Sequence, residues 1–577
     1  MNQTRTFLIF ALLAVAYLLF MAWEKDYAPH PAPSSVAAAS SAAAVPTADG
    51  SVPGATAGAA AVVPAAGVAP TTDTASATAQ LITISTDVLR LTVDTRGGSV
   101  VRSELLSYPS EPRTKKQPDP APVRLLDDER VHYFVAQSGL TTVQAANTPS
   151  APTHLSIFQS AQSSYQLVDG QNELKVDLTW QDASGLKVIK TFTLKRGSYV
   201  IDLAQRIDNG ASATWTGNAY EQMQRVAPAG TKSWWQNFSD PASHSFFGAA
   251  WYSPQDKFES LPFTDFQKKP LNRPITGGWA AMLQHYFFVA WIPSAQDATT
   301  YTTSEINPDT AQPIYLIRTL GPSISVAAGQ SASSSSRLYI GPKLQGTLDL
   351  VAPGLELSTN YGWLTVVAQP LHWLLSKLHA ISGNWGVAII LLVLLLKAAL
   401  WKLTATQFRS GAKMRKLQPR VTALKERYGD DKMKMQQAMM ELYKKEKVNP
   451  MSGCLPILVT MPVFFGLYRV LMESVELRHA PFFGWLHDLS APDPMFVLPV
   501  LYVLVMLATQ WLTPPAPGMD PAQAKMMKVM PIMFGVMFFF FPAGLVLYWV
   551  VNGATSLAQQ WYITRSVDRA DLKAKTA

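Results

Sequence analysis

The stretch that decides the fold class is WGVAIILLVLLLKAALWKL, residues 385–403. Its length is close to the ~20 mostly apolar residues that one membrane crossing needs, so it predicts a membrane-spanning helix. The run carries a charge in its interior, at Lys397. A lysine at such depth costs about 2.5–3.5 kcal/mol on insertion scales. Lys397 is therefore expected either to face a partner or a water-filled cavity, or to snorkel to the nearer interface.

Further apolar runs flank this stretch and predict a polytopic membrane protein. Toward the C terminus they cover residues 454–471, 495–512, 527–541 and 544–563. Phe541-Pro542-Ala543-Gly544 separates the last two, and together these exceed the ~20 residues of one crossing, so a tight hairpin of two short spans is predicted. A run over residues 7–23 brings the expected total to six spans.

The N-terminal run can be read as a cleaved signal peptide or as an anchor. The small residues that a signal peptidase requires come only after Trp23, Glu24 and Lys25. This order favours an uncleaved signal anchor over residues 1–26.

Charge is distributed unevenly along the sequence. Residues 1–360 carry 25 Lys+Arg against 28 Asp+Glu, a net of −3, whereas residues 361–577 carry 23 against 12, a net of +11. The loop 404–452 holds 12 basic and 5 acidic residues, whereas 473–494 holds only Arg478 against four acids. The positive-inside rule then places the first loop, both termini and the basic tail 564–577 in the cytoplasm of a cell with an inner membrane. A DNA-binding explanation of the basic excess is not favoured, because the excess lies between apolar segments.

The N-terminal half predicts a tether followed by a large β domain. Residues 27–80 are rich in Ala, Ser, Pro, Thr and Gly, which bury too little apolar area to fold. Beyond them, Leu174, Val176, Leu178 and Trp180 alternate with polar residues, as in a strand with one buried face. Similar strands and glycine turns recur over residues 81–345, which predict an antiparallel β-sandwich outside the cytoplasm.

Two amphipathic segments complete the expected organisation. Residues 361–380 have helical apolar spacing but are too short and polar to span, and so predict a periplasmic interfacial helix, or alternatively a linker helix packed on the β domain. Residues 404–450 predict a helical hairpin broken at Gly429-Asp430-Asp431. That hairpin is either a solvated coiled coil or a docking arm for apolar peptides, anionic lipid or ribosomal RNA. Its candidate docking residues are Lys413, Arg415, Lys416, Lys444 and Lys445.

Enzymatic motifs are missing. The sequence has no Walker-type loop, no His-Glu-x-x-His and no Gly-x-Ser-x-Gly elbow, so nucleotide hydrolysis, zinc chemistry and esterase chemistry have no support. A lone cysteine, Cys454, rules out an intrachain disulfide. We expect no enzyme, no metal site and no cofactor.

The C-terminal third resembles the YidC/Oxa/Alb family of membrane insertases, in its long Gram-negative form. The resemblance is carried by the segments GNWG (383–386), KMRKLQP (413–419), YKKEKVNP (443–450), GCLP (453–456), MPVF (461–464), SVELR (474–478), WLHDLS (485–490) and FPAGLVLYW (541–549). It implies an α-helical polytopic membrane protein with six spans, a five-span core over residues 384–563, a cytoplasmic helical hairpin and an all-β periplasmic domain of the β-supersandwich type.

The resemblance also implies a function. Such a protein helps to integrate, fold and assemble inner-membrane proteins, alone or beside the Sec translocon, through a hydrophilic groove. Nascent membrane proteins, the ribosome and anionic lipids are the implied partners. The groove residues carried over are Lys397, Thr460, Met461, Tyr548 and Trp549. Lys397 stands where the family usually has arginine, which keeps the charge but loses the planar donor fork.

Polar residues at membrane depth have a plainer explanation as well. Thr460 and Asn552 are of a type that commonly joins transmembrane helices by hydrogen bonds. A polytopic transporter or channel with a sugar-binding periplasmic domain remains the alternative function, because the expected domain fold resembles that of mutarotases.

Overall fold

The computed structural model describes most of the protein beyond residue 77. The described residues are 52–53, 78–113, 117–143, 148–228, 245–310, 312–359, 361–428, 431–446, 455–512 and 521–576. The predicted anchor 1–26, most of the predicted tether 27–80 and Cys454 lie outside them.

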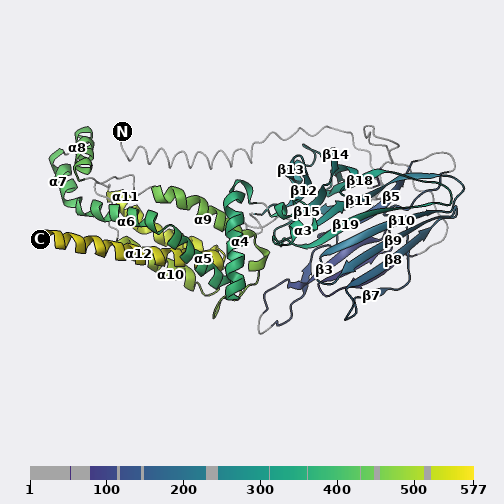
Figure 1. The fold of residues 1–577 in the computed structure, drawn as a ribbon, viewed down its shortest axis with the longest axis horizontal. Helices are drawn as coiled ribbons and strands as arrows, with labels where there is room; N and C mark the ends of the chain where they lie inside the picture. Colours follow the sequence, from purple (N-terminus) through teal and green to yellow (C-terminus); the bar gives the residue numbers. More distant parts are fainter. Residues whose placement is uncertain are drawn as a thin grey trace. The chain divides into compact units, whose positions relative to one another are not determined.

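The strands form two sheets, one of ten strands and one of nine (Figure 1). The ten-stranded sheet runs in the order β14 (Asn272–Thr276), β17 (Ala298–Ile306), β18 (Ile314–Val326), β11 (Trp215–Val226), β5 (Phe134–Thr142), β3 (Ser99–Pro109), β2 (Leu89–Asp94), β1 (Leu81–Ser85) and β7 (Ser164–Gln166), with β4 (Pro122–Arg124) beside β3. The nine-stranded sheet runs in the order β13 (Lys257–Pro262), β12 (Gly248–Ser253), β15 (Trp279–Leu283), β16 (Phe287–Pro293), β19 (Ser331–Pro342), β10 (Val200–Asn209), β9 (Leu186–Lys195), β8 (Glu173–Gln181) and β6 (Gln159–Ser160).

Alternating side chains explain how the sheets bury one face. In β8, Val176 and Leu178 are buried while Glu173, Lys175 and Asp177 are exposed. Its partner β9 alternates in the same way, and the two strands pair antiparallel. Period-two patterns place every second residue on the same face, so the apolar residues of both sheets meet in one core. The predicted all-β domain is confirmed.

A charged residue lies inside this core. Lys190 of β9 is fully buried, and its Nζ donates hydrogen bonds to Gly97 O (2.6 Å), Ser138 O (2.8 Å) and Ser138 Oγ (2.9 Å). Burial lowers the pKa of Lys190 to about 7. Gly97 has a φ of +73°, and a Cβ there would lie 2.2 Å from His154 O, so this close turn requires glycine.

The helices follow the β part in the sequence. They are α3 (Leu348–Val351), α4 (Thr365–Ser382), α5 (Trp385–Ala399), α6 (Trp401–Lys416), α7 (Gln418–Tyr428), α8 (Lys432–Lys445), α9 (Leu455–Glu473), α10 (Val497–Leu512), α11 (Pro521–Met537) and α12 (Ala543–Thr576). Short 3₁₀ helices are η3 (Phe263–Asp265), η4 (Leu355–Ser358), η5 (Gly362–Leu364), η7 (Val475–Leu477) and η8 (Phe538–Phe540).

The apolar run that decided the fold class is bent. Asn384 caps α5 by accepting a hydrogen bond from the Val387 amide (3.1 Å), and the helix ends at Ala399. The axis turns by 69° between α5 and α6. Among the described helices, none meets the length and hydropathy criteria of a membrane span by itself, whereas α5 and α6 meet them as a bent pair.

The predicted break between the last two apolar runs lies where proline forbids a continuous helix. The 3₁₀ helix η8 ends at Phe540 and α12 begins at Ala543, on either side of Phe541 and Pro542. α12 continues to Thr576, so the predicted basic tail 564–577 is helical through that residue.

The predicted helical hairpin consists of shorter pieces than the sequence suggested. The expected first arm divides at Leu417 into α6 and α7, because Pro419 lies in the first turn of α7 and cannot donate a hydrogen bond back into α6. The second arm is α8, which Asp431 caps by accepting from the Lys434 amide (3.1 Å). α7 and α8 are linked by an ion pair between Arg420 and Glu446.

α5, α9, α10 and α12 enclose the core of the helical part. Its fully buried members include Leu392, Leu467, Val470 and Val546. Close approach of α11 to α10 depends on a glycine: a Cβ at Gly535 would lie 2.1 Å from Val503 Cγ2. Tight packing of this kind fixes the positions of the polar residues that line the adjacent pocket.

Candidate functional site

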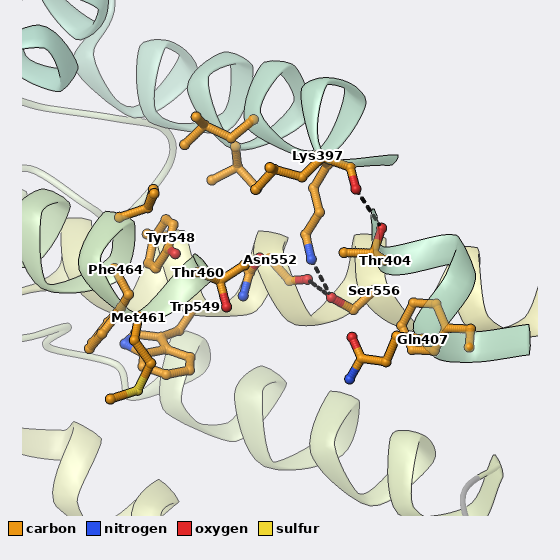
Figure 2. A pocket seen from close by; sticks show the side chains of 15 residues that line it. Lys397, Thr404, Gln407, Thr460, Met461, Phe464, Tyr548, Trp549, Asn552 and Ser556 are labelled. Atoms are coloured by element: carbon orange, nitrogen blue, oxygen red, sulfur yellow. Dashed lines mark hydrogen bonds between the residues drawn. The ribbon is translucent and has the colours of Figure 1, made fainter. Parts of the chain in front are cut away.

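A pocket of about 320 Å³ lies between α5, α6, α9 and α12. It is lined by Val393, Leu396, Lys397, Leu400, Thr404, Gln407, Phe408, Thr460, Met461, Val463, Phe464, Tyr548, Trp549, Asn552 and Ser556. Polar groups thus gather at one place in a helical part whose other packed residues are mostly apolar. Figure 2 shows these side chains converging on the pocket from the surrounding helices.

Lys397 supplies the positive charge of this pocket. It lies in the last turn of α5, and its Nζ donates a hydrogen bond to Ser556 Oγ of α12 (2.6 Å, Figure 2). Ser556 Oγ in turn donates to Asn552 O (2.7 Å). No carboxylate among the described residues pairs with Lys397. The ammonium is therefore held in place by a neutral acceptor, and its charge is left to act on whatever enters the pocket.

A second polar contact fixes the bend beside the pocket. Thr404 Oγ1 of α6 accepts a hydrogen bond from Gln559 Nε2 of α12 (2.7 Å), and both residues are buried. The same hydroxyl approaches Leu400 O (3.1 Å), one turn back at the end of α5. The bend between α5 and α6 is thus tied to α12, which also carries Ser556.

Aromatic and sulfur-containing side chains form the apolar wall. The Phe464 ring of α9 meets the Trp549 ring of α12 edge-on, with centroids 4.7 Å apart. The Tyr548 ring completes the cluster, with its centroid 6.2 Å from that of Phe464 and 6.1 Å from that of Trp549. Met461 is 47 % exposed, so a flexible thioether borders the pocket and can adapt to apolar side chains of different shapes.

The five groove residues predicted from the sequence come together in this one pocket. Lys397, Thr460, Met461, Tyr548 and Trp549 all line it. Lys397 is nearer to a helix end than the apolar run suggested, because α5 stops at Ala399. The apolar Val393 also lines the pocket, one helical turn before Lys397.

The predicted docking residues lie on two different helices. Lys413, Arg415 and Lys416 end α6, and Lys444 and Lys445 end α8. Two of them already have a partner within the protein: Asp568 of α12 lies 3.1 Å from Lys416 Nζ and 3.7 Å from Arg415 Nη2.

Sequence reasoning did not single out Thr404, Gln407, Ser556 or Gln559. A signal was present for one of them, because Tyr548, Asn552 and Ser556 are spaced four apart and share one helix face. The pairing of Ser556 with Lys397 could not be read in this way, since the two residues are 159 positions apart.

Two family models match the sequence. The model described as "60Kd inner membrane protein" covers residues 377–570, and that described as "YidC periplasmic domain" covers residues 81–374. A curated membrane protein insertase YidC of Stenotrophomonas maltophilia is 47 % identical over 591 residues, which cover 100 % of this chain and 99 % of the relative. The chain belongs to the YidC membrane protein insertase family. A more distant member, from Thioalkalivibrio sulfidiphilus, is 42 % identical over 99 % of this chain and 100 % of its own.

Two solved structures share distant similarity with this chain. A crystal structure of an active YidC insertase with its first transmembrane domain resolved covers 84 % of this chain and 95 % of its own, at 18 % identity and a TM-score of 0.36. A galactose mutarotase related enzyme from Lactobacillus acidophilus covers 45 % of this chain and 97 % of its own, at 9 % identity and a TM-score of 0.30. Family membership therefore rests on the sequence matches and not on these two structures.

Family membership decides the function at a coarse level. The protein is a membrane protein insertase of the inner membrane, and its substrates are nascent membrane proteins. This is not a family of enzymes, and the alternative of a transporter with a sugar-binding domain is not favoured.

Proposed function

We propose that the pocket between α5, α6, α9 and α12 is the groove that receives the polar part of an arriving membrane protein. The observation that supports this most directly is the position of Lys397: its ammonium faces a pocket and has a serine rather than a carboxylate as its acceptor. An acidic side chain that enters the pocket would gain an ion pair without first breaking one. Such a pair is stronger beside low-dielectric walls than in bulk water.

The other residues that line the pocket form a polar group and an apolar group, with different proposed roles. Thr460, Asn552 and Gln407 offer hydrogen bonds to a polar tail, which lowers the cost of taking it partway across the bilayer. Met461, Phe464 and Trp549 offer an apolar edge along which the hydrophobic segment of the substrate moves into lipid. Partitioning of that segment supplies the driving force, with no nucleotide.

The proposed topology follows the apolar runs and the positive-inside rule. Six spans comprise the anchor 1–26 and five within the core 384–563, both termini lie in the cytoplasm, and the β domain 81–345 lies in the periplasm after the tether 27–80. α4, within the proposed interfacial segment 361–380, lies along the periplasmic membrane surface. Its exposed Val366, Trp373 and Ile381 support that placement.

The basic ends of α6 and α8 are proposed as a cytoplasmic docking region. Lys413, Lys444 and Lys445 are exposed, whereas Arg415 and Lys416 are engaged by Asp568. Exposed lysines suit ribosomal RNA or anionic lipid, which bind by charge. Cooperation with the Sec translocon is part of the same proposal.

Depletion of the protein tests the groove hypothesis. A single-span substrate with an acidic tail is expressed in depleted cells, and exposure of its periplasmic region is mapped with protease. Exposure should fall on depletion, return fully with the wild-type protein and return only in part with Lys397→Met. Full rescue by Lys397→Met would contradict the proposed role of the groove charge while leaving the family assignment intact.

A further inference from the structure

A second and larger cavity, of about 540 Å³, lies beside α4. Its walls come from the segment just before α4, from α4 itself, from the start of α5 and from Glu476 of η7. This volume falls in the range of small-molecule sites. The cavity shares no lining residue with the groove.

Four residues that line this cavity carry buried polar atoms that form no hydrogen bond within the described part of the chain. Glu356 Oε2, Thr359 Oγ1, His372 Nε2 and Glu476 Oε2 are buried and form no hydrogen bond with the described residues. Thr359 is 5 % and His372 7 % exposed. His372 Nε2 lies 3.8 Å from Glu476 Oε1, which is within ion-pair distance but too far for a hydrogen bond. Buried polar groups of folded proteins nearly always form hydrogen bonds, so acceptors without one on residues that line a single cavity point to a ligand that donates hydrogen bonds.

The chemistry of these atoms restricts the ligand. The carboxylates of Glu356 and Glu476 accept only, and Thr359 Oγ1 can also accept. Among the described residues, no group of three or more His, Cys, Asp or Glu side chains has the geometry of a metal site. A primary ammonium, with three N–H donors and a positive charge, fits this set.

The outer part of the cavity has the opposite character. Lys377 is exposed at its border, and its Nζ lies 6.0 Å from the centre of the Trp373 ring. Trp373 is 62 % exposed and belongs to the same helix face as Val366 and Ile381, which are 83 % and 82 % exposed. The acceptors inside the cavity suit an ammonium, and the lysine at its border suits a phosphate. The apolar stripe of α4 beyond them suits acyl chains.

We infer that this cavity binds the headgroup of an ethanolamine phospholipid from the membrane leaflet on the side of the β domain. The ammonium reaches Glu356, Glu476 and Thr359, the phosphate meets Lys377, and the acyl chains follow the exposed stripe of α4. The inference rests on the interfacial placement of α4 proposed above, but not on the groove or on insertion. A bound lipid would fix α4 to the membrane surface at the point where the polypeptide leaves the β domain.

Native mass spectrometry of the full-length protein tests the inference. Delipidated protein is mixed with equal amounts of phosphatidylethanolamine, phosphatidylglycerol and phosphatidylcholine. We expect one phosphatidylethanolamine to be retained at least about tenfold over the others, because glycerol has no charge and choline has no N–H donor. Glycerophosphoethanolamine, which lacks acyl chains, should compete only weakly; strong competition would contradict the lipid as the source of the ammonium.

Variants locate the site. Glu356→Gln combined with Glu476→Gln should abolish the preference, whereas the exposed acid Asp349, changed to Asn as a matched control, should leave it intact. Thr359→Val guards against misfolding, because replacing an unpaired buried hydroxyl by a methyl group should not destabilise the lipid-free protein. It should nevertheless weaken phosphatidylethanolamine retention severalfold. An unchanged preference in both variants, or equal retention of all three lipids by the wild type, would overturn the inference. Normal phosphatidylethanolamine retention together with full rescue of insertion by Lys397→Met would count against the groove alone.

Discussion

The charge of Lys397 can be tested separately from its shape. Lys397→Met keeps a long unbranched side chain and removes the ammonium that contacts Ser556. Two unit charges ~4 Å apart interact with about 1 kcal/mol in bulk water and about 4 kcal/mol at the effective dielectric of a protein surface. Because the half-buried Lys397 lines an open pocket, we take the lower end, and about 1 kcal/mol corresponds to a roughly fivefold effect.

The assay is a double-mutant cycle on insertion. Initial insertion rates are measured for one substrate with an acidic tail and for the same substrate with its acids changed to amides, each with wild type and with Lys397→Met. We expect at least about a fivefold loss for the acidic tail and little loss for the amide tail, so that the coupling term is non-zero. Lys397→Arg should preserve the rate.

Lys402→Met is the matched control for Lys397→Met. Lys402→Met removes the same charge from an exposed position of α6 outside the pocket, and should leave both rates unchanged. Equal losses for both tails in Lys397→Met would show that the lysine acts through packing, and the electrostatic argument would fail.

Three further predictions concern the groove and the β domain. Ser556→Ala should reduce insertion of the acidic-tail substrate by less than Lys397→Met does, and Ser556→Thr should retain it, since only the hydroxyl acceptor positions Nζ; an identical loss in Ala and Thr would contradict this. Thr404→Val should lower stability by about 1–3 kcal/mol, measured as a lower melting temperature, because Gln559 Nε2 loses its buried acceptor; adding Gln559→Leu should recover part of the loss. Burial lowers the pKa of Lys190 to about 7, whereas the side chain in the unfolded chain titrates near ~10.5. Between these two pH values the unfolded state binds one more proton than the folded state. The free energy of unfolding therefore rises with pH, by at most ~1.4 kcal/mol per pH unit. The melting temperature of the wild type should therefore rise relative to Lys190→Met from pH 7 to 10, and parallel curves would refute the assignment.

The sequence by itself determined the class of the protein and many of its elements. Apolar runs of near-spanning length, period-two alternation in β8 and the proline between η8 and α12 are local signals, because each depends on the geometry of a single segment. Five residues that line the pocket were also predicted from the sequence, through the resemblance to the family: Lys397, Thr460, Met461, Tyr548 and Trp549.

Only the tertiary structure decided which side chains meet. The contact of Lys397 with Ser556 and the pairing of Thr404 with Gln559 join residues 159 and 155 positions apart, and the 69° bend after Ala399 brings both pairs to one pocket. The cavity beside α4 likewise combines Glu356, His372 and Glu476, none of which the sequence singled out as a site. A periodic pattern gives the face that a residue occupies; the neighbour of that face is set by the packing of whole helices, and that packing depends on all of the buried contacts together.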